Sequence, residues 1–278
     1  MTKFIISFCE GQHDIAFLSR ILFANGFSKY NKKLKDFPYP LNNQYISRLE
    51  LKKISDSTLG FKSNYIIPSV ALSKDNTIAL FHDLGGDGKH KERNEILNMY
   101  LNLVGNEEED QFTSRLNMDF KFIYFFDADD KGIDARLEEL NNELELSSPV
   151  QHNKILEIDG YKWGCYVFHK DPTSGELEDI LIDLMIKDNE SIFENCIDCL
   201  DNTSICQTRQ KEFICTAESE DYKGSIKFKK KKSLISMAGQ LQFSGMNNSV
   251  IISKSDYIRK SDLESNKHCL NIKELFVG

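Results

Sequence analysis

Two continuous apolar runs indicate buried β-strands, one near the start and one in the middle of the chain. Residues Lys3–Cys9 are apolar apart from Lys3 itself and Ser7, and they have no helical period. The segment FKFIYFFDADDKG, Phe120–Gly132, opens on a second run of the same kind. Such runs are typical of strands covered on both faces of a parallel sheet. A third strand is expected at Thr77–Phe81, before a glycine-rich turn.

Helical patterns follow each of these strands. After the first strand, apolar residues recur at helical spacing, at Ile15, Leu18, Ile21 and Leu22. A second helix is expected from the glycine-rich turn through about Leu103, and a third over IDARLEELNNELEL. The stretch SGELEDILIDLMI predicts a further helix with Ser174 as its N-cap. The alternation of strands and helices predicts an α/β fold, a mainly parallel sheet flanked by helices.

The rest of the chain divides into an insertion and a C-terminal extension. Residues 30–75, roughly, are irregular, basic and proline-containing, which indicates an insertion or lid after the first helix. Leu156–Ile158 and Trp163–Phe168 are expected to pair through a turn at Asp159-Gly160. Mixed helix to about Ala238 and an extended piece at Ser249–Ile252 are expected at the end. We therefore predict one domain over residues 1–185, which contains the insertion, and an α+β extension over residues 186–278 packed on it.

Composition narrows the class of protein. The chain has 278 residues with 40% hydrophobic content, 19 Phe and 10 Tyr, enough to bury a sizeable core. No stretch of about 18 apolar residues exists, so neither a membrane-spanning helix nor a membrane partner is expected. The N-terminus has no basic lead or small-residue cleavage site, which argues against a signal peptide. Seven cysteines without regular spacing indicate reduced thiols and a cytoplasmic protein.

Charge is distributed unevenly along the chain. The net charge is −8, and Gly105–Glu145 holds 13 acidic residues against 4 basic ones. In contrast, KFKKKK, Lys227–Lys232, places five lysines in six positions. A chain this acidic will not coat nucleic acid indiscriminately. This charge distribution is compatible with a metal ion in an acidic pocket and with basic residues beside it that contact a phosphate backbone. Solvated surface charge is the simpler explanation of any single charged run.

Carboxylates stand where the two long apolar strands end. Glu10 follows the first strand and Asp14 lies near the start of the next helix; Asp127 and Asp129 follow the second strand. Ligands bind at this edge of open α/β sheets. If the chain is still extended there, Asp127 and Asp129 point to the same side, and a cation between them relieves their repulsion. Carboxylate oxygens suit Mg2+ or Mn2+. The alternatives are a helix cap at Asp14 and a solvated turn at Asp127–Asp130.

A third acidic cluster occurs in GELEDIL. Glu178 and Asp179 lie in the first turn of the predicted helix, where the helix dipole favours carboxylates in any case. By the same reasoning, Glu176 is interpreted as a capping residue. From spacing alone, this cluster indicates a helix start more often than a set of ligands.

The motifs FCEGQHD and FFDADDKG, taken together in this order, resemble the Toprim domain. That family includes topoisomerases, bacterial primases, RNA-maturation nucleases and the overcoming-lysogenization-defect nucleases, to which this chain is most similar. The match gives the family's glutamate as Glu10, its Asp-x-Asp pair as Asp127 and Asp129, and its first-helix aspartate as Asp14. GELED is similar to the nuclease branch's Gly-x-Leu-Glu helix, which points to Glu178. About 110 residues separate the first motif from Asp-x-Asp, more than in the compact form, so the match requires the insertion.

The resemblance implies a Mg2+- or Mn2+-dependent nuclease that hydrolyses phosphodiester bonds of DNA or RNA, with a role in phage defence. A lysine of the late basic run also acts in that branch, and Lys227 and the four lysines after it are all candidates. We assign catalysis to Glu10, Asp127, Asp129 and Lys229. The implied metal ligands are Glu10, Asp14, Asp127, Asp129 and Glu178. The implied substrate contacts are Gly11, Gly85, Gly86 and Lys230.

Other functions remain open from the sequence. A non-catalytic module that binds nucleic acid or an ATPase through the same surface is one alternative, and a primase-like phosphotransferase is another. The ATPase half usual in the overcoming-lysogenization-defect family is missing, so the resemblance implies a separate ATPase chain as partner. No topoisomerase tyrosine domain or zinc-ribbon array is visible, which argues against strand passage.

Two further patterns carry less weight. The series Cys196, Cys199, Cys206 and Cys215 begins with the C-x2-C spacing of zinc sites but lacks a matching second pair, so small apolar packing is the alternative. His13 stands beside the expected site, where it contacts substrate or is simply a polar residue at a helix start.

Overall fold

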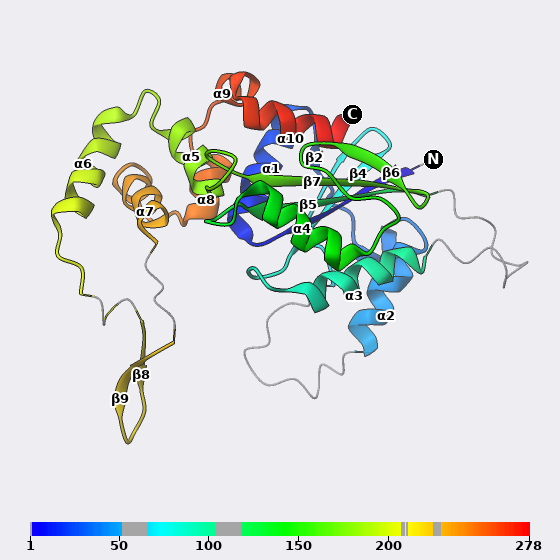
Figure 1. Ribbon diagram of the computed structural model, residues 1–278, viewed down its shortest axis with the longest axis horizontal. Helices are drawn as coiled ribbons and strands as arrows, with labels where there is room; N and C mark the ends of the chain where they lie inside the picture. Colours follow the sequence, from blue (N-terminus) through cyan, green and yellow to red (C-terminus); the bar gives the residue numbers. More distant parts are fainter. Residues whose placement is uncertain (1, 52–65, 104–117, 207–208, 210, 225–228) are drawn as a thin grey trace, which may run out of the picture.

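A seven-stranded sheet forms the centre of the protein (Figure 1). The computed structural model describes residues 2–51, 66–103, 118–206, 209, 211–224 and 229–278. The order of strands across the sheet is β2-β3-β4-β1-β5-β7-β6. These strands are β2 (Ser28–Lys29), β3 (Val70–Lys74), β4 (Thr77–Asp83), β1 (Thr2–Cys9), β5 (Met118–Asp127), β7 (Tyr161–Phe168) and β6 (Ile155–Ile158).

The four central strands β4, β1, β5 and β7 are parallel, and the outer strands β3 and β6 are antiparallel to their neighbours. Cys9 pairs with Asp83, and Asp127 pairs with Phe168, so these four strands end at one common edge. β6 and β7 form the predicted hairpin through Asp159-Gly160. The predicted fold class, an α/β protein with a mainly parallel sheet flanked by helices, is confirmed.

Helices cover both faces of the sheet (Figure 1). One face packs against α1, α5, α8, α9 and α10, and the other against α2, α3 and α4. The helices are α1 (Gln12–Ala24), α2 (Leu41–Leu51), α3 (His90–Leu101), α4 (Gly132–Leu144), α5 (Leu177–Met185), α6 (Glu190–Asn202), α7 (Lys230–Gln242), α8 (Asn248–Lys254), α9 (Lys260–Ser265) and α10 (Lys267–Val277), with a 3-10 turn η1 (Leu34–Asp36).

The two long apolar runs are buried on both faces, as their composition predicts. Along β1, Ile5 and Cys9 face the α1–α10 side, whereas Phe4 and Phe8 face the α3–α4 side. β5 alternates in the same way, with Phe125 on the first side. Because both faces of these strands are covered, neither run shows the apolar–polar alternation of a half-exposed strand. The charged residues are left at the two ends of the sheet.

Three local predictions are wrong. Ser249–Ile252 is part of helix α8, because the Asn247 side chain accepts a hydrogen bond from the Val250 N–H (3.0 Å) and starts a helix that packs on α1. The insertion over residues 30–75 is not irregular throughout, since β3 extends the sheet by pairing with β4; residues 52–65 lie outside the described part. Ser174 is not an N-cap, because α5 begins at Leu177 after Glu176.

The C-terminal part leaves the body of the protein and returns to it (Figure 1). After α5 and α6, the chain forms an antiparallel hairpin of β8 (Glu212–Cys215) and β9 (Glu220–Lys223) that projects outward. Helix α7 then packs against α5, α6 and α8. Its return brings the first turn of α7, with its lysines, to the start of α5. Within the described residues, each helix is too short or too polar to span a bilayer.

Candidate metal centre

The carboxyl ends of β1 and β5 bring two distant acidic residues into contact. Glu10 directly follows β1, and Asp127 is the last residue of β5, the neighbouring strand. The Glu10 Oε1 atom accepts a hydrogen bond from the Asp127 N–H at 3.4 Å. The Asp127 Oδ1 atom accepts another from the Leu177 N–H at 2.7 Å, in the first turn of α5. Two strands and a helix start therefore meet at Asp127.

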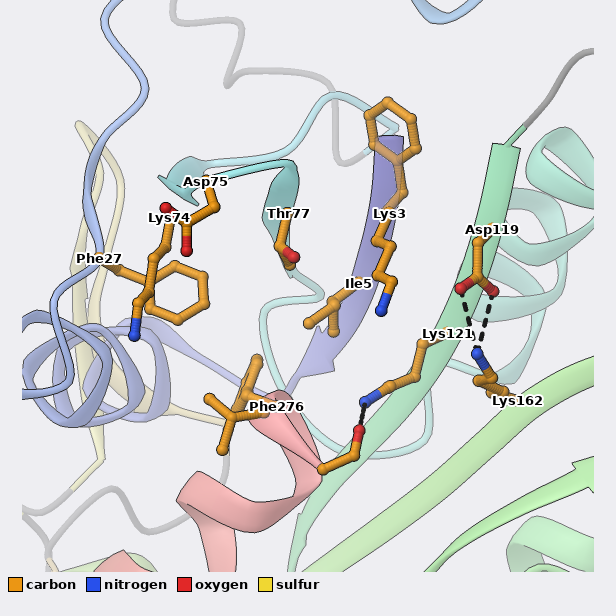
Figure 2. A pocket seen from close by; sticks show the side chains of 13 residues that line it. Lys3, Ile5, Phe27, Lys74, Asp75, Thr77, Asp119, Lys121, Lys162 and Phe276 are labelled. Atoms are coloured by element: carbon orange, nitrogen blue, oxygen red, sulfur yellow. Dashed lines mark hydrogen bonds and ion pairs between the residues drawn. The ribbon is translucent and has the colours of Figure 1, made fainter. Parts of the chain in front are cut away.

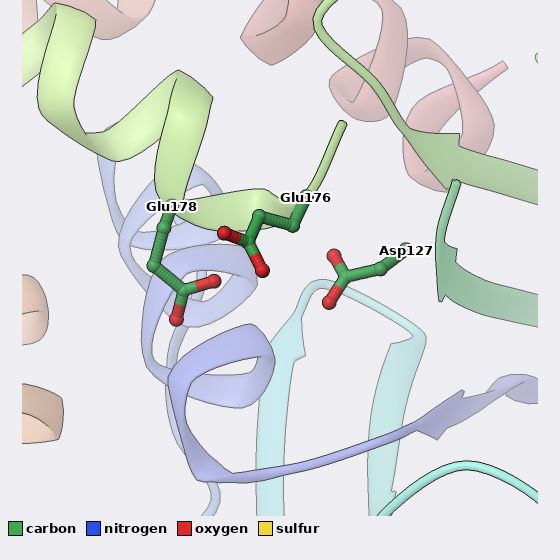
Figure 3. Close-up of side chains that lie close together, drawn as sticks. All are labelled: Asp127, Glu176 and Glu178. Atoms are coloured by element: carbon green, nitrogen blue, oxygen red, sulfur yellow. The ribbon is translucent and has the colours of Figure 1, made fainter. Parts of the chain in front are cut away.

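Three carboxylates form a compact group at this junction. Asp127, Glu176 and Glu178 each offer an oxygen within 4.8 Å of the others. Figure 3 shows the three side chains reaching toward one another from the end of β5 and the start of α5. Glu176 precedes α5 in an extended conformation, whereas Glu178 lies in its first turn and is 1% exposed. Carboxylates gathered in this way suit a hard cation such as Mg2+, which takes oxygen ligands at about 2.1 Å.

Asp14 and Glu10 extend the negative charge beside this group. Asp14 is buried in the first turn of α1, and its Oδ2 atom accepts a hydrogen bond from the Gly11 N–H at 3.0 Å. Burial and the charge of Glu10 raise the pKa of Asp14 to about 7. Burial and the charge of Asp87 raise the pKa of Glu10 to about 7.

Asp127 is the most strongly affected of these acids. Burial, followed by the charges of Asp14 and Glu10, raises the pKa of Asp127 to about 9. The carboxylates at this edge therefore cannot all be ionised at neutral pH without positive charge beside them. A bound cation and a nearby ammonium group are the two ways of supplying that charge.

Lys232 supplies part of the positive charge. Its ammonium lies 3.5 Å from Glu178, and the His13 Nδ1 atom is 3.1 Å from the same Glu178 oxygen. Burial acts to raise the pKa of Glu178, but the hydrogen bond with His13 and the charge of Lys232 outweigh it and leave that pKa below its ordinary value. For Lys232, burial acts to lower the pKa, and the charges of Glu178 and Asp127 raise it overall.

The preceding lysine contacts the same helix start. The Lys231 ammonium is 2.7 Å from Asp179 and 3.2 Å from Glu176. Lys229 is the residue before α7, and Lys230 pairs with Asp201 on α6. The lysines in contact with the acidic group are thus Lys231 and Lys232, rather than the two to which the sequence analysis assigned roles. Lys227 lies outside the described residues.

Asp129 does not stand beside Asp127 as an extended strand would place it. β5 ends at Asp127, and Asp129 has a left-handed conformation with φ of 47°. Its side chain pairs with the Arg136 Nη2 atom at 2.5 Å. The Arg136 Nε donates to the Asp127 carbonyl at 2.9 Å and its Nη1 donates to Asp87 at 2.9 Å. The prediction that Asp127 and Asp129 point to the same side required an extended chain at these residues. That requirement is not met, because the chain turns directly after the strand.

The predicted glycines lie around the same edge. Gly11 precedes α1, and Gly85 and Gly86 lie in the turn after β4 with positive φ angles of 76° and 126°. The Gly86 N–H donates to the Glu10 carbonyl at 2.7 Å, which joins the glycine-rich turn to the end of β1. These positive φ angles explain why glycine is favoured in this turn.

Sequence reasoning missed Glu176 and could not choose among the lysines. The interpretation of Glu176 as a capping residue is confirmed, since it is the N-cap of α5. Its place in the acidic group was not foreseen, although its spacing of two residues from Glu178 was the available signal. The lysines of the run are chemically equivalent in sequence, and only the packing of α7 on α5 distinguishes them.

The cysteine series does not form a cluster in the structure. Cys196 is buried on α6, whereas Cys199, Cys206 and Cys215 are exposed. Among the described residues, the one group of three or more His, Cys, Asp or Glu side chains with metal-binding proximity is Asp127, Glu176 and Glu178. The zinc alternative therefore has no geometric support.

Comparisons with known proteins bear on the fold. No protein-family model matches the chain, and no curated protein shows significant similarity to it. Among solved structures, the crystal structure of a hypothetical protein from Pyrococcus horikoshii OT3 is similar, with a TM-score of 0.51 and 17% identity. The alignment covers 99% of this chain and 95% of that one. At this level of identity the similarity indicates a shared fold over nearly the full length of both chains.

Proposed function

We propose that the protein is a Mg2+- or Mn2+-dependent nuclease that hydrolyses phosphodiester bonds of DNA or RNA at a Toprim-like acidic site. The observation that carries this proposal is the convergence of Glu10, Asp14, Asp127, Glu176 and Glu178 at one edge of the sheet, with Lys232 beside them. The order of the motifs FCEGQHD and FFDADDKG supports the same reading.

The donor set fits a hard divalent cation. Asp127, Glu176 and Glu178 would hold it, with Glu10 and Asp14 close by. When bound, the cation would polarise a phosphate oxygen and lower the pKa of water. Asp129 is less suited to be a ligand, because its carboxylate is paired with Arg136. The proposed ligand set therefore contains Glu176 in place of Asp129.

Two side chains have properties suited to the chemistry itself. The pKa of Glu10 near 7 is appropriate for a group that accepts a proton from the attacking water. As the water oxygen bonds to phosphorus and its proton passes to Glu10, the bond to the leaving oxygen breaks and that oxygen takes up a proton from solvent. Lys232 is placed to stabilise the negative charge that grows on the phosphate in this step.

Mutation of Asp127 tests the site directly. Asp127→Asn removes a charged ligand while keeping the side-chain size, so we expect cleavage to fall by about 1,000-fold or more. Plasmid, single-stranded DNA and tRNA would each be incubated with the protein, with and without Mn2+, and Mn2+ binding would be titrated separately. Asp130→Asn is the matched control, since Asp130 is an exposed aspartate of the same motif. Undiminished cleavage by Asp127→Asn would reject the mechanism.

A non-catalytic module that binds nucleic acid or an ATPase is the second candidate. It is favoured by the ion pairs of Lys231 and Lys232, which neutralise part of the acidic group from within the chain. This candidate predicts nucleic-acid or ATPase binding without cleavage at any Mn2+ concentration and no loss of that binding in Asp127→Asn. The same assays therefore separate the two functions. A separate ATPase partner and a role in phage defence rest on the sequence resemblance alone.

A further inference from the structure

A pocket of about 220 Å³ lies at the opposite edge of the sheet, at the amino ends of β1, β4 and β5 (Figure 2). Lysines from several elements surround it, and apolar side chains form another wall. In Figure 2, Lys3 and Lys121 extend toward the same space, with Lys162 held against Asp119. The apolar wall consists of Ile5, Phe27 and Phe276.

The lysines occupy positions on the core face of the sheet. Ile5 on β1 pairs in register with Lys121 on β5, which in turn pairs with Lys162 on β7. Further along β5, the same face carries Ile123, which belongs to the core under α1 and α10. Lys121 is only 9% exposed. Two lysines directly opposite each other on neighbouring strands repel, so this arrangement costs stability.

Part of the basic cluster has a structural explanation. The Lys121 ammonium donates to the Leu275 carbonyl at 3.1 Å and to an oxygen of Gly278 at 3.2 Å, and so stabilises the C-terminal end of α10. Lys162 forms an ion pair with Asp119 at 3.1 Å. Within the described part of the chain, no carboxylate contacts the Lys3 ammonium. Helix capping therefore accounts for Lys121 but not for Lys3.

The charge balance of the pocket differs from that of the whole chain. Its lining side chains include four lysines, the fourth being Lys74, against two acids, Asp75 and Asp119, a net side-chain charge of +2 in a chain of net charge −8. Burial and the neighbouring Lys162 lower the pKa of Lys121 to about 8. A dianion is the ligand that balances this excess of positive charge.

We infer that this pocket binds a small phosphate monoester with an apolar body. The ammonium groups of Lys3 and Lys121 contact the phosphate, since lysine binds phosphate as a compact point charge. The side chains of Ile5, Phe27 and Phe276 contact the apolar part. The volume is below the roughly 300 Å³ at which pockets for drug-sized ligands begin, so the ligand is small. None of the described residues that line the pocket belongs to the acidic edge, and the pocket is independent of the proposed nuclease function.

Phenyl phosphate is a suitable probe, because it combines a dianion with one apolar ring. Binding would be measured by titration calorimetry in EDTA at constant ionic strength, with inorganic phosphate and phenol as the two halves of the probe. We expect phenyl phosphate to bind at least tenfold more tightly than either half. Equal affinities for phenyl phosphate and phenol would show that the lysines do not contribute to binding. Equal affinities for phenyl phosphate and inorganic phosphate would show that the apolar side chains do not contribute.

Lys3→Met is the informative variant, since it keeps the length of the side chain and removes an ammonium that, among the residues the structure describes, contacts no carboxylate. We expect a loss of phenyl phosphate affinity of at least tenfold. Lys254→Met, which removes an exposed lysine of α8, is the matched control and should bind as the unmodified protein does. Asp127→Asn should also retain binding, because it changes only the opposite edge. Unchanged affinity in Lys3→Met would overturn the assignment.

Discussion

The two edges of the central sheet carry opposite charges. At the carboxyl ends of β1 and β5, Glu10 and Asp127 meet the acidic start of α5. At the amino ends of the same strands, Lys3 and Lys121 line a basic pocket. Burial shifts a pKa at each edge in the direction that disfavours charge, up to about 9 for Asp127 and down to about 8 for Lys121.

The contrast between the edges lies in how each charge is balanced within the chain. At the acidic edge, α7 returns to place Lys232 against Glu178, so some of the charge is neutralised by a segment that is distant in sequence. At the basic edge, Asp119 pairs with Lys162, whereas Lys121 is held by backbone oxygens. Like charges that are gathered at one edge lower the stability of the fold, so their presence there is best explained by a function that needs them. This charge distribution is consistent with the two proposals made above, a cation site at one edge and an anion site at the other.

After Asp127→Asn, the largest effect on cleavage at the acidic edge is expected from Lys232→Met. Loss of the ammonium beside Glu178 removes stabilisation of the phosphate charge, so cleavage should fall by about 100-fold. Lys230→Met is the control, because Lys230 pairs with Asp201 at the exposed surface and such pairs contribute about 1 kcal/mol or less. Nuclease assays under saturating Mn2+ measure both variants. Equal activities in the two variants would argue against a specific role for Lys232.

The pH dependence of stability should have opposite signs at the two edges. The raised pKa of Asp127 means that its contribution is fully present below the unfolded pKa of about 4 and is lost as pH rises through about 9. The lowered pKa of Lys121 means that its contribution is present above the unfolded pKa of about 10.4 and is lost as pH falls through about 8.

Thermal unfolding in EDTA between pH 5 and pH 10 measures this difference. Asp127→Asn should raise Tm relative to the unmodified protein at pH 8 to 9 by a few degrees, roughly 2–4 °C for each kcal/mol, and have little effect near pH 5. Lys121→Met should lose least stability near pH 8, where the buried ammonium is most costly, and more near pH 10. Parallel curves for all three proteins would contradict the assignment of shifted pKa values to these residues.

The smallest effect is expected from Asp129→Asn. Asp129 lies outside the close group of three carboxylates, and its partner Arg136 also pairs with Asp87 and Glu139. We therefore expect cleavage to change by less than about fivefold, or about 1 kcal/mol in the barrier. Metal titration and cleavage assays beside Asp127→Asn measure the contrast. A loss as large as that of Asp127→Asn would restore Asp129 as a metal ligand.

The class of fold could be predicted from the sequence because the signals involved are local. The continuous apolar runs of β1 and β5 report burial on both faces, and each is followed by a helix of clear period. Glu10 and Asp127 could be identified as neighbours for the same reason, since the carboxyl ends of adjacent parallel strands meet at one edge. The hairpin of β6 and β7 was equally predictable from its turn residues.

Three features of the acidic edge were decided only by the tertiary structure. They depend on contacts between distant segments or on the exact residue at which the chain turns. The left-handed conformation of Asp129 separates it from Asp127, although the motif treats the two as equivalent. Glu176 joins the acidic group because α5 starts two residues later than an N-cap at Ser174 would place it. Lys232 is selected from a run of identical residues by the packing of α7 on α5. Sequence pattern specifies periodicity and burial, whereas these choices depend on the relative placement of whole elements.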